Sequence, residues 1–374
     1  MVRTPPTATI TTETHDVVVD HTSSLRATVP RSLTDAATLT DERLTTFFAQ
    51  ELARWGPLDA DLGPLLHDLD RFCRDGGKRV RPAFAYWTFI GAGGRPEDSS
   101  IIDLCAGLEL LHAFALLHDD VMDGSDMRRH NETAHVEAAR RHRESAWRGE
   151  DRRFGEGVAI LMGDLALTYA DQLMGPLDRT TREVYAELKT ELVVGQYLDL
   201  VSAARGDTDG ERGRRIVLYK SAKYTVERPM HLGAALAGRF DELSEPLTRA
   251  GIPLGEAFQL RDDLLGLFAD STTVGKPVGD DLREGKATLL LTLATERADA
   301  AQREQLALIG GELDEDTVES LCQIIVDTGA RRRVEQRIDE LTDTALIELE
   351  CIQMDGPART ALVELATYVG RREH

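Results

Sequence analysis

The chain has 374 residues, 42% of them hydrophobic, and a formal net charge of −21. So acidic a chain repels polyanions unless local cations or metal ions reverse the field, which excludes a general nucleic-acid-binding protein. No stretch approaches 18 apolar residues, so we expect no membrane span, and four scattered cysteines without CxxC spacing predict reduced thiols in a cytoplasmic protein without zinc.

The first 40 residues differ from the rest, with 11 threonines, no sustained helical period and a proline pair at 5–6. We expect residues 1–40 to be a disordered tail. Beyond them apolar residues recur at helical spacing, for example over 41–55, 101–121, 182–203 and 331–351. Residues 41–374 are therefore predicted to form one all-α domain, a bundle of antiparallel helices around a central cavity.

Cations come in tight groups along the chain. Lys78, Arg79 and Arg81 follow a glycine pair, and Arg128 and Arg129 stand together. Arginine forks and lysine point charges are the usual protein partners of diphosphates. A basic cluster alone is more often a solvated surface, so this interpretation depends on the acidic groups nearby.

The first acidic group, Asp119, Asp120 and Asp123, lies inside an apolar helical run. At 3.6 residues per turn, Asp119 and Asp123 project from nearly the same side with Asp120 beside them. Hard oxygen ligands at this density suit Mg²⁺, which is usually shared between a few carboxylates and a substrate phosphate. His112 lies seven residues earlier on the same face, where a satisfied core histidine is the alternative interpretation.

A second acidic group, Asp262 and Asp263, begins 143 residues after Asp119 in another apolar run, and Lys276 and Lys286 follow it. Carboxylates in apolar helices are costly unless a cation compensates them. Two facing acidic helices therefore predict a Mg²⁺-dependent diphosphate site.

The segment 140–153 carries six arginines around Trp147. Nucleic-acid or membrane contact is one interpretation of such a segment. Because the chain as a whole is strongly acidic and has no recognisable nucleic-acid-binding motif, we favour a solvated loop near the entrance of the site.

Four segments of the chain resemble, in the expected order, sequence motifs of the trans-prenyl diphosphate synthases, and most closely those of the short-chain geranylgeranyl members. Residues 110–123 resemble the first aspartate-rich motif and 258–266 the second. Residues 77–82 resemble the isopentenyl diphosphate grip, and 195–199 resemble the helix that bears a Gly-Gln pair. The resemblance runs from about residue 71 to residue 286 and implies a homodimer.

The resemblance also implies a role for individual residues. Mg²⁺, three ions with substrate bound, would be held by Asp119, Asp123 and Asp262, with Asp120 and Asp263 supporting. Isopentenyl diphosphate would be bound by Lys78, Arg81, His112 and Arg129. The allylic diphosphate would be bound by Arg128, Gln259, Lys276, Lys286 and either Lys220 or Lys223 with Thr225. Arg128 and Lys223 would join the aspartates in the catalytic set.

Three departures from the family pattern stand out. Gly266 replaces the third aspartate of the second motif; Asp270 is a candidate substitute, and a solvent-facing loop acid is the equal alternative. The usual Lys-Thr pair is altered, and both Lys220-Ser221 and Lys223 with Thr225 fit it. After Arg129, His130 and Glu132 replace a glycine and a proline.

Product length should depend on what blocks the growing chain below the first acidic group. Phe114 as the bulky blocking residue beside the small Ala115 resembles the C20 type, with a C15 farnesyl product as the nearest alternative. Two other hypotheses share parts of the pattern. A class I terpene cyclase has no need of a second diphosphate grip, and a non-catalytic subunit should have lost acidic ligands.

Overall fold

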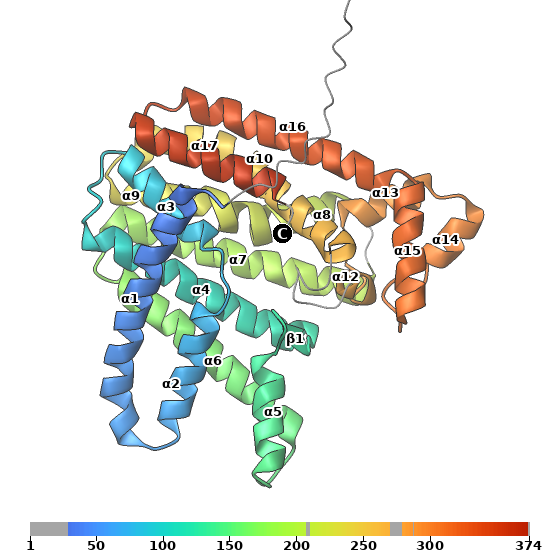
Figure 1. Cartoon of the computed structure of the whole chain (residues 1–374), viewed down its shortest axis with the longest axis horizontal. Coiled ribbons are helices and arrows are strands. Elements are labelled where there is room, and N and C mark those ends of the chain that lie inside the picture. Colours follow the sequence, from blue (N-terminus) through green and yellow to red (C-terminus); the bar gives the residue numbers. More distant parts are fainter. Residues whose placement is uncertain (1–28, 207–209, 270–278, 287, 373–374) are drawn as a thin grey trace, which may run out of the picture.

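The computed structural model describes residues 29–206, 210–269, 279–286 and 288–372, which are almost entirely helical (Figure 1). The described strands are β1 (Met127–Arg128) and β2 (Asn131–Glu132), an antiparallel pair in which Arg128 lies opposite Asn131. The predicted all-α fold is confirmed.

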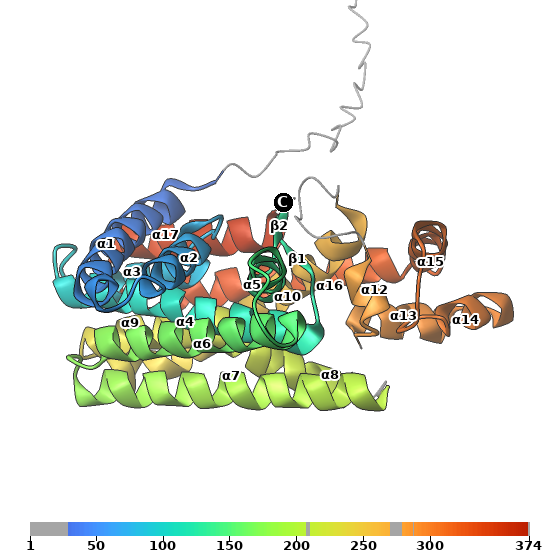
Figure 2. The ribbon, with the colours of Figure 1, turned by 90° about the horizontal axis from the view of Figure 1, so that it is seen from below.

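The helices stack in layers, with α7 at the lower edge of Figure 2. In the N-terminal half they are α1 (Arg31–Trp55), the 3₁₀ turn η1 (Gly56–Leu58), α2 (Leu62–Arg74), α3 (Val80–Gly91), α4 (Ser99–Asp123), α5 (Ala134–Glu144), α6 (Asp151–Met174) and α7 (Arg179–Arg205). The C-terminal half contains α8 (Gly210–Ile216), the π-helix η2 (Val217–Glu227), α9 (Arg228–Leu236), α10 (Phe240–Phe268), α12 (Asp280–Arg283), α13 (Leu289–Arg297), α14 (Ala300–Leu306), α15 (Glu315–Asp327), α16 (Ala330–Cys351) and α17 (Gly356–Arg371).

Helix α1 begins ten residues before the predicted start of the domain, which corrects the boundary at residue 41. Leu33, Ala36 and Thr40 are buried on one face of this early part. The threonines in this stretch interrupt the apolar pattern by which a helix is predicted. Inside the helix their hydroxyls donate to the carbonyls four residues earlier, as Thr40 does to Ala36 at 2.7 Å. Residues 1–28 of the predicted tail lie outside the described residues.

Helix α4 is the central helix of the main hydrophobic core. It packs against α1, α3 and α6, and its buried face includes Leu104, Leu108 and Leu111. By length and composition alone α4 could also cross a membrane, but 61% of its most apolar stretch is buried inside the fold. Its apolar character is therefore explained by its place in the core.

A second, smaller core lies where α10 and α16 continue past the main core. Leu260, Leu264 and Leu267 of α10 pack there with residues of α13, α15 and α16. Figure 1 shows α13, α14 and α15 projecting to the right of the long helices. The two cores hold α4 and α10 on opposite sides of a cavity that opens between them.

Candidate active site

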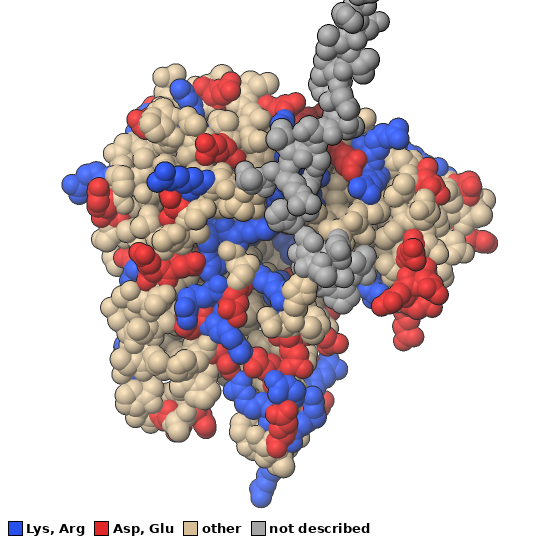
Figure 3. Space-filling model, viewed as in Figure 1, with Lys and Arg blue, Asp and Glu red and all other residues tan. Residues whose placement is uncertain are grey.

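The cavity has a volume of about 600 Å³ and is lined by α3, α4, α7, η2, α10 and α12. The predicted site residues that line it are Lys78, Arg81, His112, Ala115, Asp119, Arg128, Arg129, Lys220, Thr225, Gln259, Asp262, Asp263 and Lys286. Figure 3 shows lysine and arginine side chains gathered around a hollow in the middle of one face. The structure thus brings together residues that are up to 208 positions apart in the sequence.

The first acidic group occupies the last turns of α4, which ends where Gly124 turns left-handed with a φ of 65°. Asp119 accepts hydrogen bonds from Gln196 at 2.8 Å and from Lys220 at 3.2 Å. Carboxylates at a helix C-terminus face the negative end of the helix dipole, so this position is unfavourable unless cations compensate it. Burial and the neighbouring Asp119 raise the pKa of Asp123 to about 6.

Asp120 differs from its two neighbours because it is buried and already paired. Both oxygens accept hydrogen bonds from the guanidinium of Arg128, at 2.6–2.8 Å. Arg128 also lies 3.9 Å from Asp119. In this geometry Asp120 holds Arg128 at the edge of the cavity and does not itself line the space.

The Gly-Gln pair of α7 has a structural explanation. A Cβ on Gly195 would lie 2.6 Å from the backbone nitrogen of Lys220, so only glycine lets α7 approach η2 this closely. The approach brings Gln196 to Asp119, and it brings Asp199 within 2.6 Å of the Lys220 ammonium. Asp119 and Asp199 therefore share one lysine.

The π-helix decides the register that the sequence left open. Its wide turns place Lys220, Ser221, Tyr224 and Thr225 on the cavity side, four or five residues apart. Lys223 instead pairs with the buried Glu191 and is not among the described lining residues, so the geometry favours Lys220 for the proposed diphosphate site. A pattern of 3.6 residues per turn could not separate the two lysines.

The second acidic group faces α4 from the last turns of α10. Asp263 is buried, accepts a hydrogen bond from Gln259 at 2.8 Å, and has its pKa raised to about 8 by burial and the neighbouring Asp281. Asp262 pairs with Arg372, whose guanidinium also stacks 4.2 Å from the Phe258 ring centroid. Sequence reasoning missed Arg372, because nothing in the pattern places the end of α17 against α10.

A separate group of cations lies across the cavity at the start of α3. Arg81 donates a hydrogen bond to Thr225 at 3.0 Å and stacks on the Tyr224 ring, 4.2 Å from its centroid. His112 lies 3.2 Å from the Tyr224 hydroxyl, and burial together with Arg81 lowers its pKa well below the usual range. Lys78 completes this wall.

Arg79 stands between Lys78 and Arg81 at the cavity wall, but its guanidinium is already paired with acids of the fold. Its φ of 54° is left-handed, and its side chain is buried. The guanidinium donates to Asp41 of α1 at 2.8 Å and to Glu109 of α4 at 2.7 Å. A Cβ on Gly77 would lie 2.1 Å from this guanidinium, so the second glycine of the pair makes room for the ion pair.

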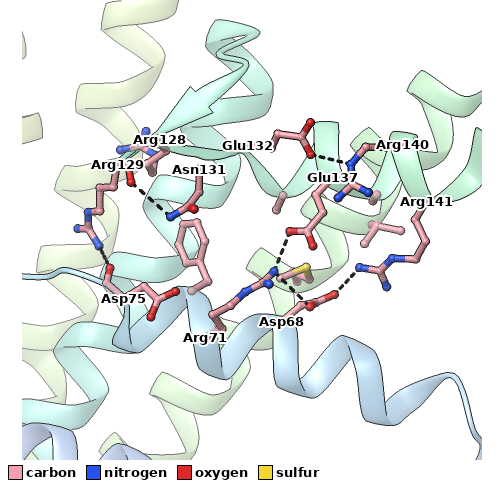
Figure 4. Close-up of a pocket in the computed structure, with 15 residues that line it drawn as sticks. Asp68, Arg71, Asp75, Arg128, Arg129, Asn131, Glu132, Glu137, Arg140 and Arg141 are labelled. Atoms are coloured by element: carbon pink, nitrogen blue, oxygen red, sulfur yellow. Dashed lines mark hydrogen bonds and ion pairs between the residues drawn. The ribbon is translucent and has the colours of Figure 1, made fainter. Parts of the chain in front are cut away.

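Arg129 and His130 form the tight turn between β1 and β2, with φ values of 50° and 67°. Arg129 donates to the carbonyl of Asp75 at 2.5 Å, which ties the turn to the end of α2 (Figure 4). Non-glycine residues in this conformation cost about 1–2 kcal/mol each. The turn is therefore strained at the position where the family pattern has glycine.

Behind the turn lies a second pocket of about 260 Å³ between α2, α5 and α6. Figure 4 shows its arginines paired with acids: Arg71 with Asp68 and Glu137, Arg140 with Glu132, and Arg141 with Asp68. The arginine-rich segment is thus largely neutralised by local acids. These ion pairs hold α5 against α2 and support the turn that carries Arg128 and Arg129.

The two predicted chain-length residues separate in the structure. Ala115 lines the cavity, whereas Phe114 is not among the described lining residues. The Phe114 ring packs edge-on against His118 at 4.8 Å between centroids, and His118 reaches the Ile160 carbonyl of α6 at 3.0 Å. Phe114 therefore lies on the α6 side of α4. Lys276 and Asp270 lie outside the described residues.

The donor set fits Mg²⁺ by its chemistry. Asp119 and Asp262 offer hard carboxylate oxygens from two sides of the cavity. Asp123 is not among the described lining residues, and burial together with the neighbouring Asp119 raises its pKa. Among the described residues, no three acidic, histidine or cysteine side chains form a closed metal cage.

The family model described as Polyprenyl synthetase matches residues 64–325. The chain belongs to this family. The short chain isoprenyl diphosphate synthase of Methanothermobacter thermautotrophicus is 31% identical over 322 residues, covering 84% of this chain and 93% of the relative. The octaprenyl diphosphate synthase of Escherichia coli is 33% identical over 303 residues, covering 80% and 87%. This prenyl synthase chain is thus similar to relatives named for different product lengths.

Solved structures of prenyl synthases share the fold. A geranylgeranyl pyrophosphate synthase from Corynebacterium glutamicum, complexed with isoprenyl diphosphate and magnesium, has a TM-score of 0.87 at 35% identity. The likeness covers 91% of this chain and 99% of that one. The resemblance drawn from the sequence motifs is confirmed at the level of the family and the fold.

Proposed function

We propose that this protein is a Mg²⁺-dependent prenyltransferase that condenses isopentenyl diphosphate with allylic diphosphates, with geranylgeranyl (C20) diphosphate as its main product. The observation that gives most support is that one cavity contains two separate charged groups, one of carboxylates and one of cations. Carboxylates of α4 and α10 face each other, and a separate cation group at Lys78, Arg81 and Arg129 lies beside them. A cyclase, which binds one diphosphate, has no use for the second group.

In this proposal Asp119, Asp123 and Asp262 hold Mg²⁺, which when bound supplies positive charge to the departing pyrophosphate. Lys220, Lys286, Gln259 and Arg128 would bind the allylic diphosphate from the same side. Because Lys220 is already oriented by Asp119 and Asp199, its ammonium needs little reorganisation when the leaving group develops charge.

Lys78, Arg81, His112 and Arg129 would hold isopentenyl diphosphate with its double bond toward the allylic carbon. Breaking the allylic C–O bond leaves a carbocation, the double bond attacks it, and a proton is lost to the pyrophosphate. His112 is neutral in this environment, so it serves as a hydrogen-bonding partner rather than a cation. The residues position two substrates and stabilise charge, and none has to act as a strong base.

For the product length, Ala115 lines the cavity one turn before Asp119, and Phe114, next to it on the α6 side of α4, is the proposed limit to the growing chain. A C15 product remains the nearest alternative to C20. Relatives named for octaprenyl products show that this family also reaches longer chains.

A homodimer is supported by apolar side chains that α6 and α7 leave exposed; Figure 2 shows α7 at the lower edge of the molecule, with α6 above it. They are Phe154, Ile160, Leu161, Val193, Val194, Tyr197 and Leu200. On α7 they recur at helical spacing as one stripe, which is typical of a face that packs on another helix. A second copy of this chain, working in the cytoplasm, is the proposed partner.

The deciding experiment is a product analysis. Purified protein is incubated with Mg²⁺, isopentenyl diphosphate and, separately, the C5, C10 and C15 allylic diphosphates, and products are identified by mass spectrometry. Accumulation of C20 diphosphate is expected. A C15 or longer product would revise the length alone, while absence of condensation with every primer would reject the proposed activity.

A further inference from the structure

The second acidic motif lacks its third carboxylate, and a different part of the chain occupies the vacant position. Gly266 lies one turn after Asp262 and Asp263, on the same face of α10. Among the described residues, a Cβ on Gly266 would meet the Oδ2 of Asp281 at 3.2 Å. The carboxylate of Asp281 therefore stands where an acidic side chain at position 266 would project.

The backbone holds Asp281 in this place. The amide of Gly279 donates to the carbonyl of Gly266 at 3.3 Å, and Gly279 turns left-handed with a φ of 85° to start α12. The amide of Lys286 donates to the Asp281 carbonyl at 3.1 Å on the other side. The segment that carries Asp281 is thus joined through Gly279 to the glycine that Asp281 faces.

The surroundings of Asp281 point to a cation. Its side chain lines the cavity and is 29% exposed, and the ammonium of Lys286 lies 3.4 Å from it. The same ammonium lies 3.7 Å from Asp123 on the opposite wall. One positive charge is therefore shared by carboxylates of both walls and by Glu284, while Asp262 beside them pairs with Arg372.

We propose that Asp281 supplies the carboxylate that Gly266 lacks, and that it acts with Asp262 in holding Mg²⁺ on the α10 wall. This inference rests on the proposed function, because it assigns a further residue to the same metal site. Mg²⁺ keeps several of its waters when bound, so a carboxylate placed beside a ligand contributes to affinity even without direct coordination. The departure at Gly266 is then a relocation of the acid and not a loss.

The test measures metal affinity without turnover. Mn²⁺ binding in the presence of inorganic pyrophosphate is followed by isothermal titration calorimetry, and folding of each variant is checked by circular dichroism. Asp281→Asn should weaken Mn²⁺ binding by about 10- to 100-fold. The matched control is Asp316→Asn, which removes an exposed acid of α15 that does not line the cavity, and it should leave the affinity unchanged.

Two further variants separate this role from its alternatives. Gly266→Asp in the Asp281→Asn background should recover most of the lost affinity, because it returns the carboxylate to the α10 wall. Gly266→Asp alone should bind Mn²⁺ no better than the parent protein, since two acids then compete for one space.

The alternative is that Asp281 acts only by orienting Lys286, and its effect on Mn²⁺ binding would then vanish without Lys286. In a Lys286→Met background, Asp281→Asn should still weaken Mn²⁺ binding. An unchanged affinity in Asp281→Asn, no recovery in the double variant, or an effect that vanishes without Lys286 would overturn the inference. Because no condensation is measured, these outcomes are independent of the product analysis, which tests the proposed function itself.

Discussion

At the scale of single residues, the cavity depends on side chains whose polar groups are already paired within the protein. Arg79 is the clearest example, because its buried guanidinium links α1 to α4 at the cavity wall that also carries Lys78 and Arg81. Its left-handed backbone is strained, and strain of this kind persists where the surroundings compensate it. Arg79 is a positioning residue for the cation group beside it.

Arg79→Lys should raise the KM for isopentenyl diphosphate by about 10-fold or more and leave the KM for the allylic substrate nearly unchanged, because the cation group shifts. Steady-state kinetics with each substrate varied in turn measures this. Arg79→Gly, which accepts the left-handed backbone but lacks the guanidinium, should show the same defect. Arg228→Lys weakens another largely buried ion pair, that of the Arg228 guanidinium with Glu191, and serves as the matched control. An equal rise in the KM for isopentenyl diphosphate in this control would contradict the assignment.

His112 should titrate well below pH 6.5 in the free protein, since burial and Arg81 disfavour its charged form. Because its folded pKa lies below the unfolded value, protonation favours the unfolded chain, and this contribution to stability is lost as pH falls below about 6.5. NMR titration, with His112→Gln to assign the signal, measures the pKa. Adding isopentenyl diphosphate should raise the pKa of His112. A pKa near 6.5 that does not change when the ligand is added would count against the proposed site.

At the scale of elements, two local departures from regular structure shape the site. The π-helix η2 turns Lys220 and Thr225 toward the cavity and Lys223 away from it. The strained turn at Arg129 and His130 presents two arginines to the cavity, Arg128 just before the turn and Arg129 at its start. In both cases an irregular element replaces an ordinary helix or a glycine turn next to the proposed chemistry.

His130→Gly should stabilise the protein by about 0.4–1 kcal/mol, because glycine adopts a positive φ without strain. Urea unfolding monitored by circular dichroism gives the difference in the free energy of unfolding. Asn131→Gly is the control, since Asn131 is not among the described residues with positive φ, and it should not stabilise. A destabilised His130→Gly would show that the turn is not strained at this residue.

At the scale of the whole molecule, the long helices α6 and α7 present apolar side chains to the outside. Leu161 of α6 and Ile347 of α16 are equally exposed, at 63%, but only Leu161 belongs to the group that we assign to the dimer. The two residues therefore make a matched pair.

Leu161→Glu should convert the dimer to monomer, because a buried unpaired carboxylate in an interface is costly. Size-exclusion chromatography with light scattering measures the mass in solution. Ile347→Glu should stay dimeric. If Leu161→Glu is still dimeric, the dimer contact lies elsewhere on the surface. If the parent protein is monomeric, the proposed dimer does not exist.

The sequence by itself determined the helical class, the family and most of the residues that meet in the cavity. It could do so because helical periodicity and charged residues at fixed spacings are local properties, visible in Asp119 and Asp123 or in Lys78 and Arg81. The tertiary structure decided which neighbours share a surface. The burial of Arg79, the contact of Arg372 with Asp262 and the approach of Asp281 to Gly266 join segments far apart in the chain or separated by an irregular turn. Such contacts depend on how helices pack, and no spacing within one helix encodes them.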